Sequence, residues 1–334
     1  MRRSLVLAER PQGHPGRGTF ALQEDEIPEP GPGEVVTRTI WLSIDPYMRG
    51  RLSERRSYAA PVAIGAPMTG ETVGEVIASA DPAFAAGDVV LGPRGWQTHI
   101  VSEAKRLIKL PHGEAPLSTY LGVLGMPGTT AYSGMKDIGV PKPGETVVVS
   151  AASGAVGSVA GQIAKRAGCR VVGVAGGPEK CLWVQEALGF DACIDRRVPY
   201  LGKMLAEECP NGIDVYFENV GGVVQDAVWP MLNNFGRVVM CGMIAQYSDS
   251  EVRAGPNLGQ VVTKRLRIEG LIVSDKPERF AEWRALAGPW VRDGSLRYRE
   301  TVIDGLDSAP DALRLVLTGG NFGKMLVRVG PDPA

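Results

Sequence analysis

The chain has few of the residues from which metal centres and disulfide frameworks are built. Only five cysteines and three histidines occur among its 334 residues. No two cysteines form a Cys-x-x-Cys motif, and neither residue type gathers with metal-ligand spacing. An odd number of widely separated cysteines is typical of free thiols in a reducing compartment, so we expect no metal site and a cytoplasmic location. These residues are Cys169, Cys181, Cys193, Cys209, Cys241, His14, His99 and His112.

The chain also lacks an excess of either charge and any long apolar run. Its 36 basic and 37 acidic residues leave a formal net charge of -1, and no basic stretch carries interleaved aromatic residues, which argues against a nucleic-acid partner. No apolar run approaches the length that spans a bilayer, and the first nine residues hold too short an apolar core for a signal peptide. The length and the 44% hydrophobic content predict a globular protein of two domains.

Two kinds of sequence pattern divide the chain. Proline, glycine and short alternating runs dominate roughly the first 120 residues, which predicts an irregular β domain. Strand and helix patterns then alternate from about Pro127 to Gly294, as a parallel sheet covered by helices requires. A short helical stretch and a closing strand follow, and we expect them to return to the first domain. The expected strands are 33–40, 72–78, 88–91, 98–101, 170–175, 213–217, 237–241, 266–273 and 325–329, and the last helix is 309–317.

The most informative stretch runs from Val147 to Gly157. A β-branched apolar run leads into a loop of small residues, and a helical pattern follows directly. Ala152, Gly154 and Gly157 occupy the three positions of the dinucleotide-binding fingerprint, in which the second glycine admits the phosphates and the third lets the helix lie close to the sheet. The strand pattern at 170–175 completes a β-α-β unit of about 30 residues. An ordinary tight turn would show the glycines alone, so the combination predicts a dinucleotide site.

The end of the second strand indicates which dinucleotide is bound. NAD sites place an Asp or Glu there, about 20 residues past the glycines, to bind the ribose 2′-hydroxyl. Here the strand ends in Ala175-Gly-Gly-Pro178 with no carboxylate at its tip, and Lys180 follows. Arg196 and Arg197 come directly after the next apolar run. All three cations could instead be ordinary surface residues. The missing acid and the nearby cations together favour NADPH over NADH.

Five segments, spread over the whole chain, carry a family resemblance. They are Ile-Asp-Pro-Tyr-Met-Arg at 44–49, Met-Pro-Gly-Thr-Thr-Ala-Tyr at 126–132, Ala-Ala-Ser-Gly-Ala-Val-Gly-Ser at 151–158, Phe-Glu-Asn-Val-Gly-Gly at 217–222 and Asn-Phe-Gly-Lys at 321–324. With these segments in this order, the chain resembles the medium-chain dehydrogenase/reductase superfamily. Within it, the resemblance is to the zinc-independent enone reductases: prostaglandin reductases, plant double-bond reductases and bacterial curcumin reductases. The segment 51–58 is most similar to the curcumin-reductase type.

The resemblance implies a fold and an assembly. The fold is α/β, with a Rossmann doubly wound parallel sheet inserted in a GroES-like, mostly β domain. The implied GroES-like substrate domain comprises residues 1–123 and 298–334, and the dinucleotide-binding domain comprises residues 124–297. The implied assembly is a homodimer.

Departures from the zinc alcohol dehydrogenases of the same superfamily bear on the chemistry. Where those enzymes have a cysteine ligand, this chain reads Ser43-Ile-Asp45, and the position of a histidine ligand holds Gly70. The cluster of four structural cysteines is also missing. Without a Lewis acid to polarise an alcohol or carbonyl group, direct hydride delivery to an electron-poor carbon is the chemistry that remains.

The resemblance also implies which residues meet NADPH. Lys180 corresponds to a lysine that contacts the 2′-phosphate, and Arg196 replaces a tyrosine near that phosphate. Asn219 lies at a strand end and could instead cap a turn, while residues 271–273 match backbone that meets the nicotinamide amide and could also be plain core. The full implied set is Gly154, Ala155, Val156, Gly157, Lys180, Arg196, Asn219, Cys241, Gly242, Met243, Ile244, Tyr247, Leu271, Ile272, Val273 and Asn321.

The implied reaction is reduction of the carbon–carbon double bond of an α,β-unsaturated ketone or aldehyde. Hydride reaches the β-carbon, negative charge develops on the carbonyl oxygen, and a proton must reach the α-carbon. Tyrosine hydroxyls suit both tasks, and the resemblance points to Tyr247 and Tyr58 as catalytic candidates, with Tyr47 as a further substrate contact. Each could instead be a packing residue, which is the commoner role of a single tyrosine.

Two other functions are compatible with the same residues. A quinone oxidoreductase would use the same fold and cofactor but pass hydride to a quinone. A non-catalytic NADPH-binding protein would hold the cofactor without turnover. Turnover of enones, enals and quinones, followed by NADPH absorbance, separates the three functions.

Overall fold

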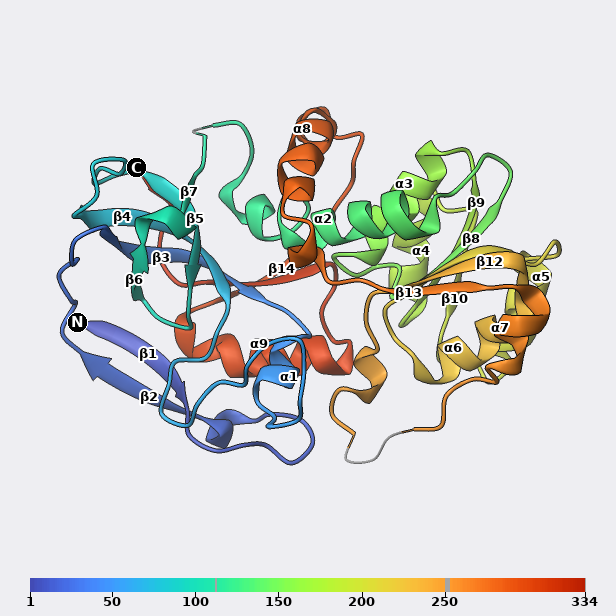
Figure 1. The fold of residues 1–334 in the computed structure, drawn as a ribbon, viewed down its shortest axis with the longest axis horizontal. Coiled ribbons are helices and arrows are strands. Elements are labelled where there is room, and N and C mark those ends of the chain that lie inside the picture. Colours follow the sequence, from blue (N-terminus) through green and yellow to red (C-terminus); the bar gives the residue numbers. More distant parts are fainter. Residues whose placement is uncertain (112, 250–252, 334) are drawn as a thin grey trace. The chain divides into compact units, whose positions relative to one another are not determined.

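The computed structural model describes residues 1–111, 113–249 and 253–333, so His112 lies outside the described residues. The chain forms two compact units (Figure 1). Unit 1 consists of Met1–Leu121 and Glu300–Ala334, and unit 2 consists of Gly122–Arg299. These borders fall two residues from the domain borders expected from the sequence. Unit 2 is therefore inserted between the two segments of unit 1.

The core of unit 2 is a parallel sheet of six strands in the order β10-β9-β8-β11-β12-β13. Chain order runs outward from β8 to β10 on one side and from β11 to β13 on the other. The direction therefore reverses between β8 and β11, and doubly wound folds bind ligands at the carboxyl ends of the strands at such a reversal. The strands are β8 (Thr146–Ser150), β9 (Arg170–Ala175), β10 (Ala192–Asp195), β11 (Ile213–Glu218), β12 (Leu232–Met240) and β13 (Arg267–Gly270).

Helices cover both faces of this sheet (Figure 1), because its central strands carry fully buried apolar runs, residues 147–149 in β8 and 215–217 in β11. One face packs against α3 (Gly157–Arg166) and α4 (Pro178–Glu186), and α2 (Met126–Ser133) packs against α3. The other face packs against α5 (Leu201–Glu208) and α6 (Gly222–Val228), which share an apolar cluster with alternate residues of the strands. The remaining helices are α7 (Gly259–Lys264) and α8 (Glu278–Arg292). The expected α/β class and doubly wound sheet are confirmed.

Unit 1 is mostly β. Its main sheet has the order β14-β15-β3-β4-β5-β7, and β6 pairs with β3. Strand β15, from the end of the chain, lies between β14 and β3 and is antiparallel to β3. The strands are β3 (Glu34–Ile44), β4 (Glu71–Ser79), β5 (Val89–Arg94), β6 (His99–Glu103), β7 (Ile108–Lys109), β14 (Glu300–Asp304) and β15 (Lys324–Arg328), with helices α1 (Met48–Arg51) and α9 (Ala309–Thr318).

An N-terminal antiparallel pair, β1 (Arg2–Leu7) with β2 (Phe20–Asp25), was not expected from the sequence. The apolar residues Leu5, Val6 and Leu7 are buried in it. Within the described ranges, no helix combines the length and the apolar character that crossing a bilayer would need.

Candidate functional site

The loop between β8 and α3 has the geometry of a phosphate-binding turn. Ala151 adopts a positive φ of 49°, and the Gly154 N–H donates to the Ala151 carbonyl oxygen at 2.9 Å. A Cβ on Gly157 would lie 2.4 Å from that same oxygen, so only glycine allows α3 to approach the strand this closely. Among the described residues, no side chain caps the first turn of α3. Such a helix end favours an anion through its N–H groups and dipole.

Three cations meet at the carboxyl ends of β9 and β10. The Arg196 Nε lies 3.3 Å from where a Cβ on Gly176 would be, and the Arg197 Nη2 lies 2.6 Å from the same position on Gly177. Lys180 belongs to the first turn of α4. Burial lowers the pKa of Lys180, and the charges of Arg196 and Arg197 lower it further. We call Lys180, Arg196 and Arg197 the cationic cluster.

Asp195 is the residue of this region that the sequence reasoning missed. As expected, β9 itself carries no carboxylate at its tip. The neighbouring strand β10, however, supplies one. Asp195 ends β10 in register with Ala175, and its carboxylate accepts the Gly177 N–H at 2.9 Å. It also pairs with the Arg197 guanidinium at 2.9 Å, and hydrogen bonds from Arg197 lower the pKa of Asp195 to about 2. One arginine thus neutralises the acid, and the cluster keeps a positive excess.

The reversal between β8 and β11 is organised by a buried carboxylate. Glu218 is fully buried, and its Oε1 accepts the Ser150 hydroxyl at 2.9 Å, the Val220 N–H at 2.7 Å and the Gly221 N–H at 3.0 Å. Its Oε2 finds no hydrogen-bond partner in the part of the chain that the structure describes. These three uncharged donors thus hold the carboxyl end of β11 in place.

Asn219 ties the same two strand ends together. Its backbone N–H donates to the Ser150 hydroxyl at 2.8 Å, and its side-chain Nδ2 donates to the Ser150 carbonyl oxygen at 2.8 Å. The side chain is therefore locked across the reversal. The structure supports a structural role for the amide nitrogen, and cofactor contact by Asn219 stays a prediction.

The segment from Cys241 to Tyr247 runs alongside the end of β11. The N–H groups of Cys241 and Gly242 both donate to the Glu218 carbonyl oxygen, at 2.9 Å and 3.0 Å. The Met243 N–H donates to the Tyr247 hydroxyl oxygen at 3.2 Å, which turns the phenol toward its own loop. Burial and the nearby Glu218 raise the pKa of Cys241 to about 12, so this thiol stays protonated. The backbone of this loop, rather than its thiol, is fitted to face a ligand.

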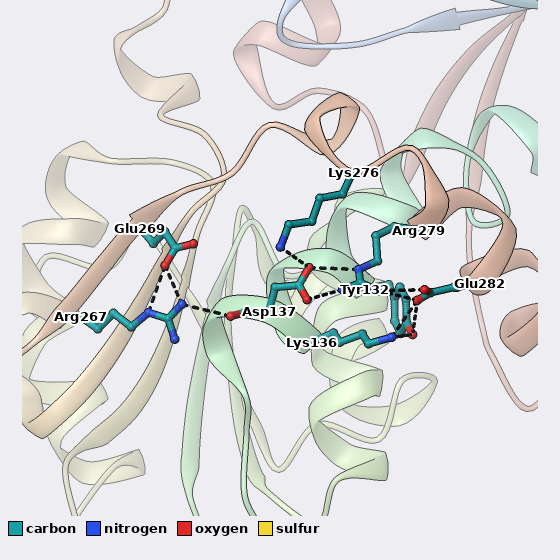
Figure 2. Close-up of polar contacts among 8 residues, drawn as sticks. All are labelled: Tyr132, Lys136, Asp137, Arg267, Glu269, Lys276, Arg279 and Glu282. Carbon is teal, nitrogen blue, oxygen red and sulfur yellow. Dashed lines mark hydrogen bonds and ion pairs between the residues drawn. The ribbon is translucent and has the colours of Figure 1, made fainter.

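An ion-pair network supports the segment that follows β13 (Figure 2). The Asp137 carboxylate contacts the Arg279 guanidinium at 2.8 Å and the Lys276 ammonium at 3.1 Å. Asp137 lies in the π-helical turn η4 (Gly134–Gly139), whereas Lys276 and Arg279 follow the turn η7 (Val273–Asp275). Burial raises the pKa of Asp137, but the hydrogen bonds from Arg279 and Lys276 outweigh it and leave the pKa lowered.

Glu282 extends the network on α8. It pairs with Lys136 and with Arg279, each at 2.7 Å (Figure 2).

The backbone that follows β13 is fixed by a hydrogen bond from the Leu271 N–H to the Met240 carbonyl oxygen, at 3.1 Å. Residues 271–273 are half-buried and lie just beyond the end of β13, so they are not interior core. Their fixed backbone is compatible with the expected amide contact, which stays a prediction.

In unit 1, the structure brings Tyr47 and Tyr58 together around one cation. The Arg51 guanidinium lies 5.4 Å from the Tyr47 ring centre and 4.8 Å from that of Tyr58. Burial raises the pKa of the Tyr47 phenol, and the negative charges of Asp45 and Glu71 add to the effect. Tyr47 therefore keeps its proton as a hydrogen-bond donor, whereas Tyr58 is 59% exposed.

A buried ion pair occupies the part of unit 1 in which zinc enzymes carry a cysteine ligand. The Lys324 ammonium lies 2.7 Å from the Asp45 Oδ1, with only 4% and 7% of the two side chains exposed. Lys324 also donates to the Ile44 carbonyl oxygen at 2.8 Å, and the Ser43 hydroxyl donates to the Asp45 Oδ2. Two of the five resemblance segments thus meet in one contact. Asn321, in the same segment as Lys324, donates its Nδ2 to the Gly323 carbonyl oxygen at 2.8 Å.

Gly70 lies in a tightly packed core that leaves no room for a side chain. A Cβ on it would lie 2.8 Å from the Leu42 Cδ1, 3.0 Å from the Trp96 Nε1 and 3.1 Å from the Met48 Cε. A histidine could stand there only if this core moved. Within the described ranges, no group of three or more Cys, His, Asp or Glu side chains has an arrangement that could hold a metal ion.

Comparisons with known proteins cover both units. Residues 3–110 match the family model described as the N-terminal domain of oxidoreductase, and residues 155–288 match that of zinc-binding dehydrogenase. The NADPH-dependent curcumin reductase of Escherichia coli K12 is 48% identical over 99% of this chain and 97% of its own length. The NADP(+)-dependent 2-alkenal reductase of Nicotiana tabacum is 43% identical over 99% of this chain and 98% of its own length. The chain belongs to the enone-reductase branch of the medium-chain dehydrogenase/reductase superfamily.

A solved structure in this branch adds the cofactor. CurA of Vibrio vulnificus, solved in complex with NADPH, is 46% identical, covers 99% of this chain and 100% of its own, and superimposes with a TM-score of 0.94. The segment that matches the zinc-binding dehydrogenase model, 155–288, includes neither Asp45 nor Gly70. That description therefore carries no information about the two positions at which zinc ligands would stand.

Proposed function

We propose that this enone-reductase family member reduces the carbon–carbon double bond of α,β-unsaturated ketones or aldehydes with NADPH. It is an NADP-dependent oxidoreductase, as its full-length relatives are. The observation that carries the cofactor choice is the cationic cluster. It gathers three positive charges against one neutralised acid at the end of β9, where the 2′-phosphate of NADPH needs counter-charge.

The residues described fit this cofactor along the whole carboxyl edge of the sheet. Gly154–Gly157 would receive the pyrophosphate at the start of α3, and Lys180 with Arg196 would hold the 2′-phosphate. Asn219, residues 241–244 and residues 271–273 would position the nicotinamide end, and Asn321 is proposed as a late contact. When bound, NADPH supplies the hydride. The chain must place the substrate, keep water out and stabilise the charge that develops on the carbonyl oxygen.

Tyr247 is the proposed donor to that oxygen. The Met243 N–H donates to its phenol oxygen, so the oxygen acts as an acceptor there and the hydroxyl proton can be donated to the substrate. A phenol is neutral at physiological pH and can donate without itself being ionised. Tyr58 is proposed as a substrate contact and an alternative proton source. Tyr47, with its raised pKa, is proposed to donate a hydrogen bond to the substrate.

The Tyr247→Phe variant tests this role. It keeps the ring and removes the hydroxyl, so kcat/KM for an enone should fall by about one to three decades, or roughly 1.4–4 kcal/mol, with NADPH affinity nearly unchanged. Tyr200→Phe is the matched control, because Tyr200 is 57% exposed in the same unit. Enone kinetics that are identical in Tyr247→Phe and the unaltered protein would move the role to Tyr58 or to water.

A panel of acceptors separates the enone reductase from the other two functions. Turnover of each acceptor is measured by the loss of NADPH absorbance. We expect higher kcat/KM values for enones and enals than for 1,4-benzoquinone. A higher value for the quinone would favour the quinone oxidoreductase. Cofactor binding without turnover of any acceptor would favour the non-catalytic NADPH-binding protein.

We further propose that the reaction needs no zinc. The support is the filled position of Gly70 and the Asp45–Lys324 pair where zinc enzymes place ligands. Elemental analysis after chelation should find no stoichiometric zinc, and enone turnover should persist. A tightly held zinc whose removal abolishes turnover would refute this part of the proposal.

We also propose a cytoplasmic homodimer with unit 1 as the substrate domain and unit 2 as the cofactor domain. Strand β13 supports the dimer, because it ends the six-stranded sheet and all four of its residues are exposed. Light scattering should give twice the chain mass of 35.6 kDa. A mass equal to one chain would contradict it. Cell fractionation tests the location.

A further inference from the structure

Two cysteines lie side by side next to the cationic cluster. Cys181 is on α4, one residue after Lys180, and Cys193 is on β10, two residues before Asp195. Each thiol is the largest single influence on the pKa of the other, so the two side chains are neighbours. The two residues belong to successive elements of the chain, and the packing of α4 on β10 brings them together.

A glycine makes the room for these sulfur atoms. Cys193 is in register with Gly173 of β9. A Cβ on Gly173 would lie 3.1 Å from the Cys193 Sγ and 3.1 Å from the Val184 Cγ1, and Val184 lies one helical turn after Cys181 on α4. The pair is thus enclosed between α4 and the sheet. Cys181 is buried and Cys193 is half-buried, so a small reagent would reach the pair from the side of Cys193.

The surroundings divide two chemical roles between the thiols. The hydrogen bond from Cys193 lowers the pKa of Cys181, and the charge of Arg197 lowers it further. The same hydrogen bond, together with burial, raises the pKa of Cys193. The cysteines outside the pair all have raised pKa values, about 11 for Cys169 and Cys209 and about 12 for Cys241. Of the two neighbouring thiols, Cys181 is therefore the better candidate for the nucleophile, with Cys193 in place as its partner.

We propose that Cys181 and Cys193 form a reversible disulfide when the protein meets hydrogen peroxide, and that this bond weakens NADPH binding. The Cys181 thiolate attacks peroxide, the O–O bond breaks, hydroxide leaves and a sulfenic acid forms. The Cys193 sulfur then attacks the Cys181 sulfur, the S–O bond breaks, and water leaves with the Cys193 proton. Two thiols are oxidised and one peroxide is reduced to water. A dithiol reductant reverses the bond.

The effect on NADPH rests on the proposed function of the cationic cluster. A disulfide bond is about 2.05 Å long, shorter than a hydrogen-bond contact between sulfurs, so its formation draws the first turn of α4 toward β10. Lys180 lies in that turn, and Arg196 and Arg197 follow the end of β10. Displacing charge-assisted contacts should raise the NADPH dissociation constant by roughly threefold to tenfold.

The test measures formation of the Cys181–Cys193 disulfide and binding of NADPH separately. The unaltered protein, Cys181→Ser, Cys193→Ser and the control Cys169→Ser are each exposed to hydrogen peroxide. The control keeps a hydroxyl donor for the Lys142 carbonyl oxygen, which the Cys169 thiol contacts at 3.1 Å. Mass spectrometry of digested protein measures the cross-linked peptides, dimedone traps sulfenic acid, and fluorescence titration measures the NADPH dissociation constant before and after reduction.

We expect a 181–193 cross-link in the unaltered protein and in Cys169→Ser, trapped sulfenic acid in Cys193→Ser, and neither product in Cys181→Ser. The dissociation constant should rise only where the cross-link forms and should recover on reduction. An absent cross-link in the unaltered protein, or a cross-link with an unchanged dissociation constant, would overturn the proposal. A cross-linked protein whose reduced form does not bind NADPH would instead refute the proposed cofactor site, because the mass measurement does not depend on the cofactor.

Discussion

Two carboxylate–cation arrangements, one in each unit, use the same chemical groups for opposite purposes. In unit 1, Asp45 and Lys324 form one pair with almost no exposed surface. In unit 2, Asp195 meets Arg197 while Lys180 and Arg196 stand close by, so cations outnumber the acid. The Arg197 side chain is 57% exposed.

The difference teaches how charge number and burial set the role of an ion pair. A balanced buried pair has no charge to offer a ligand, and removing either member leaves the other uncompensated. An exposed set with excess positive charge contributes little to stability but attracts an anion. We therefore expect changes in unit 1 to act on stability and changes in the cationic cluster to act on NADPH affinity.

The largest effect should come from Lys324→Met. Removing the ammonium leaves the Asp45 carboxylate buried without a partner, which should cost roughly 3–5 kcal/mol of unfolding free energy. Urea unfolding measures it. Arg328→Met is the control, because Arg328 is on the same strand in an exposed pair with Asp304. Equal midpoints for the two variants would show that burial does not distinguish the pairs.

Lys180→Ala should change affinity instead of stability. Loss of one charge-assisted contact to the 2′-phosphate should weaken NADPH binding by about one to two decades, or roughly 1.5–3 kcal/mol, while NADH binding changes little. Titration of both cofactors measures this selectivity. Lys203→Ala controls for the general loss of positive charge, because the Lys203 side chain on α5 is 75% exposed. Equal NADPH and NADH affinities in the unaltered protein would refute the role of the cluster.

Asp137→Asn tests an intermediate case, a half-buried network near neutral balance (Figure 2). The variant should lose about 1 kcal/mol of stability at pH 7 after solvent screening. Because the pKa of Asp137 is lowered from 3.8, the wild-type advantage is present above pH 3.8 and is lost as the pH falls through the folded-state pKa. Thermal unfolding from pH 7 to pH 3 measures the advantage. A difference between the two proteins that stays constant over this range would show that the carboxylate charge is not responsible.

The smallest effect should come from Asp195→Asn, which removes the carboxylate that pairs with Arg197 in the cluster. Asparagine can still accept the Gly177 N–H, so the turn should persist. NADPH affinity should rise by about twofold to threefold, since exposed charges interact weakly. NADPH titration of both proteins at low and at high salt measures the difference in affinity. The difference should be smaller at high salt, because salt screens exposed charges. A fall in NADPH affinity would mean that Asp195 holds Arg197 in its binding position.

Much of the fold could be predicted because its signals are local. The run at 170–175 is β9 as expected, and the glycine pattern at 154 and 157 marks the turn into α3. The β1–β2 pair could not be predicted, because its apolar run is short and its burial depends on distant contacts, such as the Leu5 N–H with the Trp96 carbonyl oxygen. Tertiary context decides such strands.

The candidate site was predictable where one segment supplies it. The glycine loop and Lys180 follow directly from the order of residues, and the family segments add Asn219 and Tyr247. Asp195 and Asp137 carried no local signal. Asp195 reaches Gly177 only through the register of β10 with β9, and Asp137 reaches Arg279 only through packing of η4 against α8. Such contacts are fixed by the folded chain, so a single sequence does not reveal them.

The position of β15 in the middle of the unit 1 sheet has a consequence for how the protein is made. During synthesis, the residues of β3 leave the ribosome long before β15 exists, and the whole of unit 2 emerges in between. Unit 2 is continuous in sequence and can fold as soon as it emerges. Until Lys324 arrives, the nascent unit 1 holds the Asp45 carboxylate without its cation and β3 with an open edge. The last-made strand therefore completes the first-made unit, and a chain released before residue 324 is made holds a folded unit 2 and an incomplete unit 1.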